Sequence, residues 1–273
     1  MDAINPTAKR VIAVAGCKGG IGKTLIAVNL ALALAGRGQR VVLMDGNLSV
    51  PDVGISLGLD KKLDVSSLSF DAQGMDSLML SGPSGIKVLT PANDDDWRES
   101  IQIGDTVQLI NQMDELASSL DTLIIDTAPG LAPDTMTLVQ AAAEILIVLN
   151  QELVSLADAV KQIKTLYHVF NVHRFCIVVN AVSSRRCGAR QFEQLQHHLN
   201  DENQIVLSYL GSIPFDKSVS EALSQQTALI KMSPQCRAAK AFQKLGHMVS
   251  ALPVPEPRGR IEFFMPTRIR ERV

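Results

Sequence analysis

Residues 10–24 constrain the fold of this chain more than any other segment. An apolar run at 11–15 leads into a turn with four glycines, and Lys23 and Thr24 then open an alanine- and leucine-rich stretch that continues to residue 35. A buried parallel strand, a glycine-rich turn and a helix N-terminus, in this order, aim backbone N–H groups at a polyphosphate. The segment therefore predicts a nucleotide phosphate-binding loop.

The residues of the loop have separate expected tasks. Lys23 is expected to reach the β- and γ-phosphates, and the Thr24 hydroxyl to ligate Mg²⁺. The first glycine of the strict G-x-x-x-x-G-K-[ST] pattern falls on Cys17, whose small thiol is expected to leave the cradle intact. The predicted nucleotide-binding set within the loop is Cys17, Lys18, Gly19, Gly20, Ile21, Gly22, Lys23, Thr24 and Leu25.

Strand-like and helical patterns alternate along the rest of the chain. The predicted strands are 11–15, 41–44, 86–89, 122–125, 144–149, 175–179 and 206–211, and the predicted helices are 24–35, 105–118, 134–142, 156–170, 189–199, 219–226 and 235–249. This alternation predicts an α/β fold, with a mostly parallel, doubly wound sheet covered by helices on both faces. We expect one domain over 10–250, a short N-terminal tail at 1–9 and a basic, apolar tail at 251–273.

Polar residues follow several of the predicted strands. Asp45, Asp126 and Asn180 all lie where an apolar strand ends. Ligands of open parallel sheets bind beyond the carboxyl ends of the strands, so these residues are expected to share one site with the loop. Asp126 is expected to hold the metal through water and Asp45 is the nearest acid on the neighbouring strand, which gives Thr24, Asp45 and Asp126 as the predicted metal set.

The stretch Lys18-Gly-Gly-Ile-Gly-Lys-Thr24 resembles the deviant Walker A motif of the MinD/ParA ATPases, a family of P-loop NTPases. In that family the extra lysine, here Lys18, reaches the nucleotide of a partner across an ATP-sandwiched dimer. Segments 40–45, 57–59 and 123–130 follow in the family's order. The resemblance implies ATP and Mg²⁺ as cofactors and a homodimer, and it matches Asn180 and Pro214 to two adenine-side positions. The sequence contains no N-K-x-D or T-K-x-D motif for guanine.

Two later segments, 211–222 and 252–264, resemble the FlhG (FleN) group of this family, and the likeness runs from about residue 10 to residue 264. This group controls flagellar number and placement. The resemblance implies a flagellar enhancer-binding transcription activator as partner, with the FlhF GTPase and flagellar switch proteins as further partners. The four cysteines form no C-x-x-C pair, which is typical of buried thiols in a reducing cytoplasm, so we expect a cytoplasmic protein for which any contact at the inner membrane or the cell pole is peripheral.

The segment after the second strand departs from the family. Where relatives have D-x-D, this chain has Asp45-Gly-Asn47. An asparagine can orient a water molecule but cannot accept its proton, so ATP hydrolysis is expected to be slow or lost. Asp52 is an alternative acid a few residues later. The predicted catalytic set is Lys18, Lys23, Asp45, Asn47 and Asp126.

The charge distribution bears on the remaining alternatives. Net charge is −2, and residues 258–273 hold five arginines and two glutamates, a net +3, so the rest of the chain sums to −5. A ParA-type partition or positioning ATPase that binds DNA is therefore less favoured, and no sequence-specific nucleic-acid partner is expected. A pseudo-ATPase binding module remains a further alternative. Ile261, Phe263 and Phe264 are expected either to enter an anionic membrane surface or to dock on the protein itself.

Overall fold

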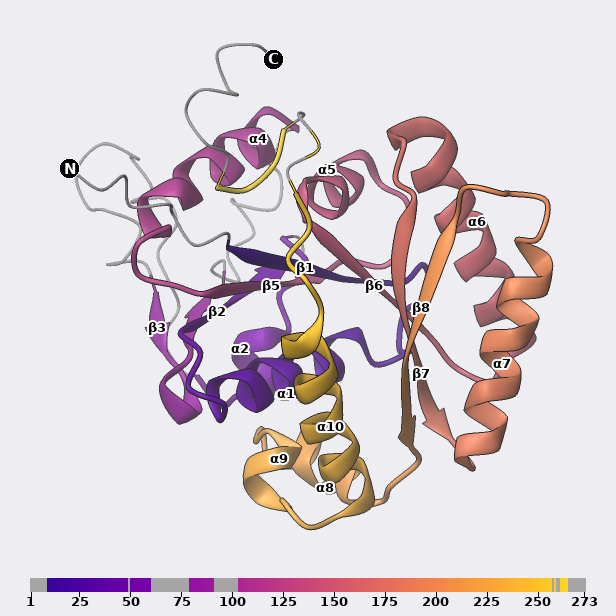
Figure 1. Cartoon of the computed structure of the whole chain (residues 1–273). Helices are drawn as coiled ribbons and strands as arrows, with labels where there is room; N and C mark the ends of the chain where they lie inside the picture. The colour runs from indigo at the N-terminus through magenta and orange to yellow at the C-terminus, as the bar shows by residue number, and fades with distance from the viewer. Residues whose placement is uncertain are drawn as a thin grey trace.

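A computed structural model describes residues 9–48, 50–59, 79–90, 103–256, 258 and 261–264. Its centre is an eight-stranded sheet with helices on both faces (Figure 1). The strands are β1 Arg10–Ala15, β2 Val41–Gly46, β3 Leu80–Ser81, β4 Lys87–Leu89, β5 Thr122–Thr127, β6 Glu144–Leu149, β7 Arg174–Val182 and β8 Val206–Pro214. The helices are α1 Lys23–Ala35, α2 Val53–Ser56, α4 Ile103–Gln112, α5 Pro133–Ala141, α6 Leu153–Phe170, α7 Arg185–His198, α8 Ser218–Ser224, α9 Leu229–Met232 and α10 Arg237–Ala251, with 3-10 turns η3 Pro83–Gly85 and η4 Met113–Leu116.

The strand order is β3-β4-β2-β5-β1-β6-β7-β8, and every described pairing is parallel except that of β3 with β4. The apolar runs at 11–15 and 123–125 lie at the centre because both of their faces are buried. The register places Asp45 directly beside Asp126 on neighbouring strands. The predicted mostly parallel, doubly wound sheet is confirmed.

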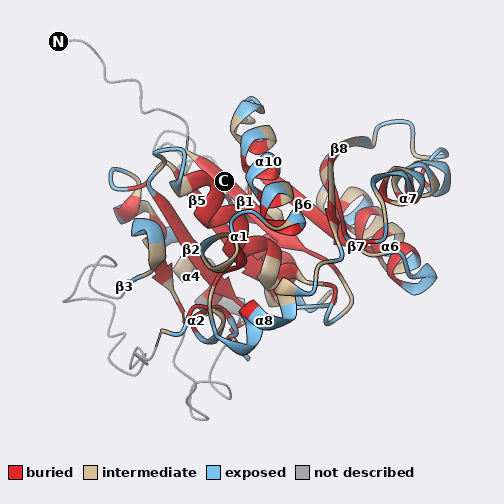
Figure 2. Cartoon of the chain, turned by 90° about the horizontal axis from the view of Figure 1, so that it is seen from below, coloured by how far each residue is buried: buried red, intermediate tan, exposed pale blue. Residues whose placement is uncertain are grey.

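Two aliphatic cores lie on either side of the sheet. One includes buried residues of α4, α5, α6 and α7, and the other includes those of α1, α9 and α10. Figure 2 shows buried strands at the centre, and outer surfaces of α7 and α10 that are exposed. Because helices cover both faces of the sheet, its polar side chains gather at the two ends of the strands.

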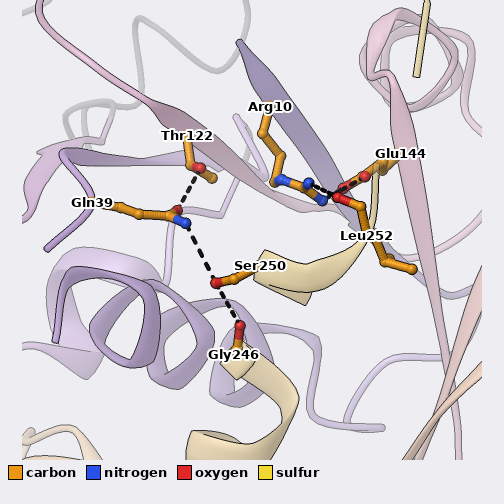
Figure 3. Close-up of polar contacts among 7 residues, drawn as sticks. All are labelled: Arg10, Gln39, Thr122, Glu144, Gly246, Ser250 and Leu252. Carbon is orange, nitrogen blue, oxygen red and sulfur yellow. Dashed lines mark hydrogen bonds and ion pairs between the residues drawn. The ribbon is translucent and has the colours of Figure 1, made fainter. Parts of the chain in front are cut away.

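The chain after α10 crosses the amino ends of the central strands; we call residues 252–256, 258 and 261–264 the strap. Arg10 at the start of β1 forms a buried ion pair with Glu144 of β6, at 2.6 Å, and also donates to the Leu252 carbonyl (Figure 3). The same region is tied together by Gln39, which accepts from the Thr122 hydroxyl. The strap is therefore anchored to the sheet at its first residue.

The far end of the strap docks on α5 and η4. Arg258 donates to the Gln140 carbonyl at 2.7 Å, and Phe263 is only 6% exposed within the core that includes α5. Phe264 donates its N–H to Asp114 and packs against the same core. Of the two alternatives for the tail, the described part adopts docking on the protein itself. Its remaining arginines at 260, 268, 270 and 272 lie outside the described residues, as do residues 1–8.

Several element boundaries differ from the prediction. Helix α7 begins at Arg185, four residues before the predicted 189, because Ser184 caps it by accepting from the Cys187 N–H. The short elements α2, β3 and α9 were not predicted, since so few residues carry no visible period. No described helix is long and apolar enough to cross a membrane.

Candidate functional site

The loop between β1 and α1 has the backbone form that a phosphate cradle requires. Gly22, which precedes α1, has φ +93°, a left-handed conformation that favours glycine. A Cβ on Gly16 would stand 2.4 Å from the Ile21 side chain and 2.9 Å from the Val148 carbonyl oxygen. By contrast, a Cβ on Gly19 or Gly20 would meet nothing within 4 Å. The loop is thus closely packed at its base and open at its exposed rim.

Asn180, at the end of β7, holds this loop from behind. Its side-chain amide donates to the Ile21 carbonyl at 2.8 Å, and a Cβ on Gly22 would lie 2.2 Å from the same nitrogen. Asn180 is 6% exposed and Ile21 is 3% exposed. The structure therefore brings Asn180 to the phosphate loop, where it fixes the loop's shape.

The two lysines of the loop have different surroundings. Lys23 is buried, and its ammonium donates to the Lys18 carbonyl at 3.3 Å. Burial lowers the pKa of Lys23, against the attraction of Asp126. Lys18 is partly exposed, and its ammonium pairs with the carboxylate of Glu152, just before α6. Asn150 donates to the other oxygen of Glu152 at 3.2 Å. Lys23 thus points into the site, whereas Lys18 is held by its own subunit.

The structure brings together Asp45, Asp126 and Thr24, the three residues of the predicted metal set. Burial and then the repulsion of Asp126 raise the pKa of Asp45 to about 8, and burial raises that of Asp126 to about 7. The Thr24 hydroxyl is hydrogen-bonded to Asp126, while the Oδ1 atom of Asp126 is buried without a partner among the described residues. An unpaired buried carboxylate oxygen beside a hydroxyl matches Mg²⁺, which takes one or two carboxylates and completes its shell with phosphates and water.

Asp45 has a different set of partners from Asp126. Its carboxylate accepts backbone N–H groups from Asn47, Asp52 and Val53 at 3.1, 2.8 and 2.9 Å. These bonds wrap the segment after β2 around the Asp45 side chain. Asp45 therefore organises this segment as well as lying beside Asp126.

Asn47 and Asp52 lie on that same segment and have different surroundings. The Asn47 amide donates to the Val50 carbonyl at 2.6 Å and so closes a local turn. Asp52 is exposed, yet its charge acts on both Lys23 and Asp126. Of the two side chains, Asp52 is the one whose charge acts on the groups beneath the loop.

The structure separates the remaining predicted site residues. Leu25 lies in the first turn of α1. Burial raises the pKa of the Cys17 thiol to about 11, so this thiol stays protonated at neutral pH. Pro214 ends β8 and lines a separate pocket beside that strand. Sequence reasoning did not find Glu152. Its signal was a polar Asn-Gln-Glu segment directly after the apolar strand at 144–149, at the same edge of the sheet as the loop.

Comparison with known proteins identifies the family. The ParA family model described as "NUBPL iron-transfer P-loop NTPase" matches residues 7–250. The chain belongs to the ParA family of P-loop NTPases. Among ParA-family relatives, it is 34% identical to the antiactivator FleN of Pseudomonas aeruginosa over 97% of this chain and 94% of FleN. It is also 28% identical to an uncharacterized ATP-binding protein of Methanocaldococcus jannaschii, over 89% of each chain.

Solved structures agree on the ParA-family fold. The cell-division ATPase MinD of Pyrococcus furiosus matches with a TM-score of 0.76 and 25% identity, over 90% of this chain and all of that one. MinD of Pyrococcus horikoshii, solved with Mg-ADP, matches with a TM-score of 0.74 and 24% identity, over 89% and 97%. The predicted resemblance to MinD/ParA ATPases and to FleN is confirmed.

Proposed function

We propose that this chain is an ATP-dependent, dimerising regulatory switch of the FleN kind, which restrains a flagellar enhancer-binding transcription activator. The observation that carries this proposal is the position of Lys18 within the phosphate loop. The chain is also similar to the antiactivator FleN over 97% of its own length. The FlhF GTPase and flagellar switch proteins are further partners on the same resemblance.

In this proposal the loop holds ATP and Thr24 and Asp126 hold Mg²⁺. The N–H groups of the loop and the ammonium of Lys23 would hold the phosphates, and the unpaired Oδ1 of Asp126 would accept from the metal's water. Bound Mg²⁺ supplies positive charge that offsets the charge of the triphosphate. Asp45 holds the segment after β2 in place, so that this segment can respond to what the loop contains.

A second copy of the chain is the proposed cover for the exposed apolar residues at this edge. Leu153 and Val154, beside Glu152, are 79% and 60% exposed, and Val50 and Ile55, in and near the segment after β2, are 54% and 50% exposed. Apolar side chains gathered around a ligand site are typical of an interaction surface. Lys18 lies among them, where it can turn from Glu152 to the nucleotide of the partner.

Mass in solution tests the dimer. We expect a monomer without nucleotide or with ADP, and a dimer with Mg-ATP, by sedimentation velocity. Lys18→Ala should bind Mg-ATP in calorimetry yet remain monomeric, whereas Lys231→Ala, an exposed lysine on α9, should behave like the parent. A dimer that forms equally without ATP would instead support the alternative of a pseudo-ATPase binding module.

Hydrolysis is proposed to be slow. Phosphotransfer depends on positioning and charge stabilisation, and Asn47 cannot accept a proton from the attacking water. Phosphate release measured with Mg-ATP should be slower than that of MinD, and Asn47→Asp should raise it. Turnover that equals that of MinD would contradict this part of the proposal.

A further inference from the structure

A pocket of about 460 Å³ runs beside β8, at the edge of the sheet. Six consecutive residues of the strand, 209–214, line it. Consecutive side chains of a strand point to opposite faces, so a pocket that touches all six reaches around the strand, and Val178 and Val182 of β7 add to its lining on the inner side. Its other walls are the first turns of α7 and one side of α10. We call this pocket the edge groove.

The edge groove is strongly basic. Arg185 lies on its α7 wall, and Arg237, Lys240 and Lys244 lie on its α10 wall, while no lining residue is acidic. All four cations are exposed, and none has a carboxylate within ion-pair distance among the described residues. Because the whole chain has a net charge of −2, this cluster is a local feature.

Among the described strands, β8 pairs only with β7, so its outer edge has no strand beside it. At its two ends, Val206 donates its N–H to His173 and the residue after the strand, Phe215, donates to Val182, both on the β7 side. Backbone groups alternate in direction along a strand, so others of β8 face away from β7. The register shifts between Ile177 and Val178 of β7, which leaves Leu210 as the extra residue of a bulge in the groove.

We propose that the edge groove docks an extended, acidic segment of a partner protein, whose backbone pairs with the outer edge of β8. An added strand gains main-chain hydrogen bonds, and alternate side chains provide specificity. Acidic side chains of the segment meet Lys240 and Lys244, and its apolar side chains meet Leu210 and Leu245. This inference goes beyond the proposed function, because it depends neither on ATP nor on dimerisation.

An acidic protein segment fits better than nucleic acid. Duplex DNA is bound by proteins that neutralise many phosphates along an extended surface. Here four cations surround a narrow groove with an apolar floor that includes Val178 and Leu245. A groove of this shape matches one extended chain with alternating acidic and apolar side chains.

The test measures fluorescence anisotropy with a labelled peptide of alternating Glu and Val. We expect the parent protein to bind it, and the double variant Lys240→Glu/Lys244→Glu to bind at least about tenfold more weakly. The matched control Lys161→Glu/Lys231→Glu, with exposed lysines on α6 and α9, should bind like the parent. Retained Mg-ATP binding by both double variants would show that they are folded.

Three further arms of the experiment can overturn the proposal. A peptide with N-methyl groups on alternate residues should bind weakly, since its backbone cannot pair with β8. If it binds as tightly as the unmodified peptide, non-specific charge attraction explains the binding and the proposal is wrong. Mg-ATP should not displace the peptide; competitive displacement would make the groove the base end of the nucleotide site. A short DNA duplex that binds with the same sensitivity to Lys240 and Lys244, when the peptide does not, would assign the groove to nucleic acid.

Discussion

At the scale of single residues, the pairing of Lys18 with Glu152 is the contact that most affects the proposed switch. The lysine expected to serve a partner subunit is engaged within its own subunit, and Asn150 steadies the glutamate. Glu152 also has a lowered pKa because Lys18 donates a hydrogen bond to it, so it stays charged at neutral pH. Dimerisation that uses Lys18 must therefore first break this pair.

Glu152→Gln should consequently favour the dimer. An exposed ion pair contributes little, so we expect the dimer dissociation constant with Mg-ATP to fall by at most about fivefold. Sedimentation velocity over a range of protein concentrations measures it. Glu193→Gln, an exposed glutamate on α7, is the control and should leave the constant unchanged. A weaker dimer in Glu152→Gln would show that the glutamate acts in the dimer and not as a restraint on the monomer.

Asp52 is the second residue for which the structure predicts an effect. Its carboxylate acts on Lys23 and Asp126, whereas the Asn47 amide is bonded to Val50. Asp52 is the acid that the segment after β2 offers in place of the residue that Asn47 replaces, and we expect it to assist hydrolysis. Asp52→Asn should then lower phosphate release by about tenfold or more without weakening Mg-ATP binding. An unchanged rate would exclude Asp52 from the reaction, and Asp201→Asn, an exposed residue after α7, is the control.

At the scale of elements, the sequence predicted what repeats along the chain but not what joins distant segments. Apolar runs located seven of the eight strands, most clearly β1, β2, β5 and β6, because strands buried on both faces contain little else. The role of Asn180 was different. Its amide contacts Ile21 from 159 positions away, a pairing that no local pattern encodes. The sequence matched Asn180 to an adenine-side position, which stays a prediction, and the structure adds its contact with the phosphate loop.

The strap is an element whose contribution to stability can be measured. Phe263 is 6% exposed and packs into the core on the α5 side of the sheet, whereas Ile261 is 37% exposed. Phe263→Ala should therefore lower the free energy of unfolding by about 3 kcal/mol. Ile261→Ala should lower it by less than about 1 kcal/mol, and urea denaturation compares the two. Similar small losses from both variants would mean that the strap does not stay docked in solution.

At the scale of the whole molecule, two buried carboxylates that are suited to a metal ion cost stability when no ligand is bound. Asp45 and Asp126 lie side by side in a buried layer of the sheet, and their pKa values are about 8 and 7 instead of 3.8. A metal ion that binds there requires the charged carboxylate, so its binding releases protons. Nucleotide binding, protonation and folding are therefore linked through one pair of residues.

This linkage predicts an opposite effect of pH on the empty and the loaded protein. In the empty protein the folded state retains protons that the unfolded chain loses near pH 3.8, so the stabilisation is complete below that pH and disappears as pH rises through about 7 and 8. Its Tm in calorimetry should fall from about pH 6 to about pH 8.5. With Mg-ADP, the stabilisation by ligand should increase over the same range, since the carboxylates are then ready to bind the metal. Asp45→Asn removes the repulsion of Asp126 and should flatten the decline of the empty protein; a decline as steep as that of the parent would mean that other groups cause it.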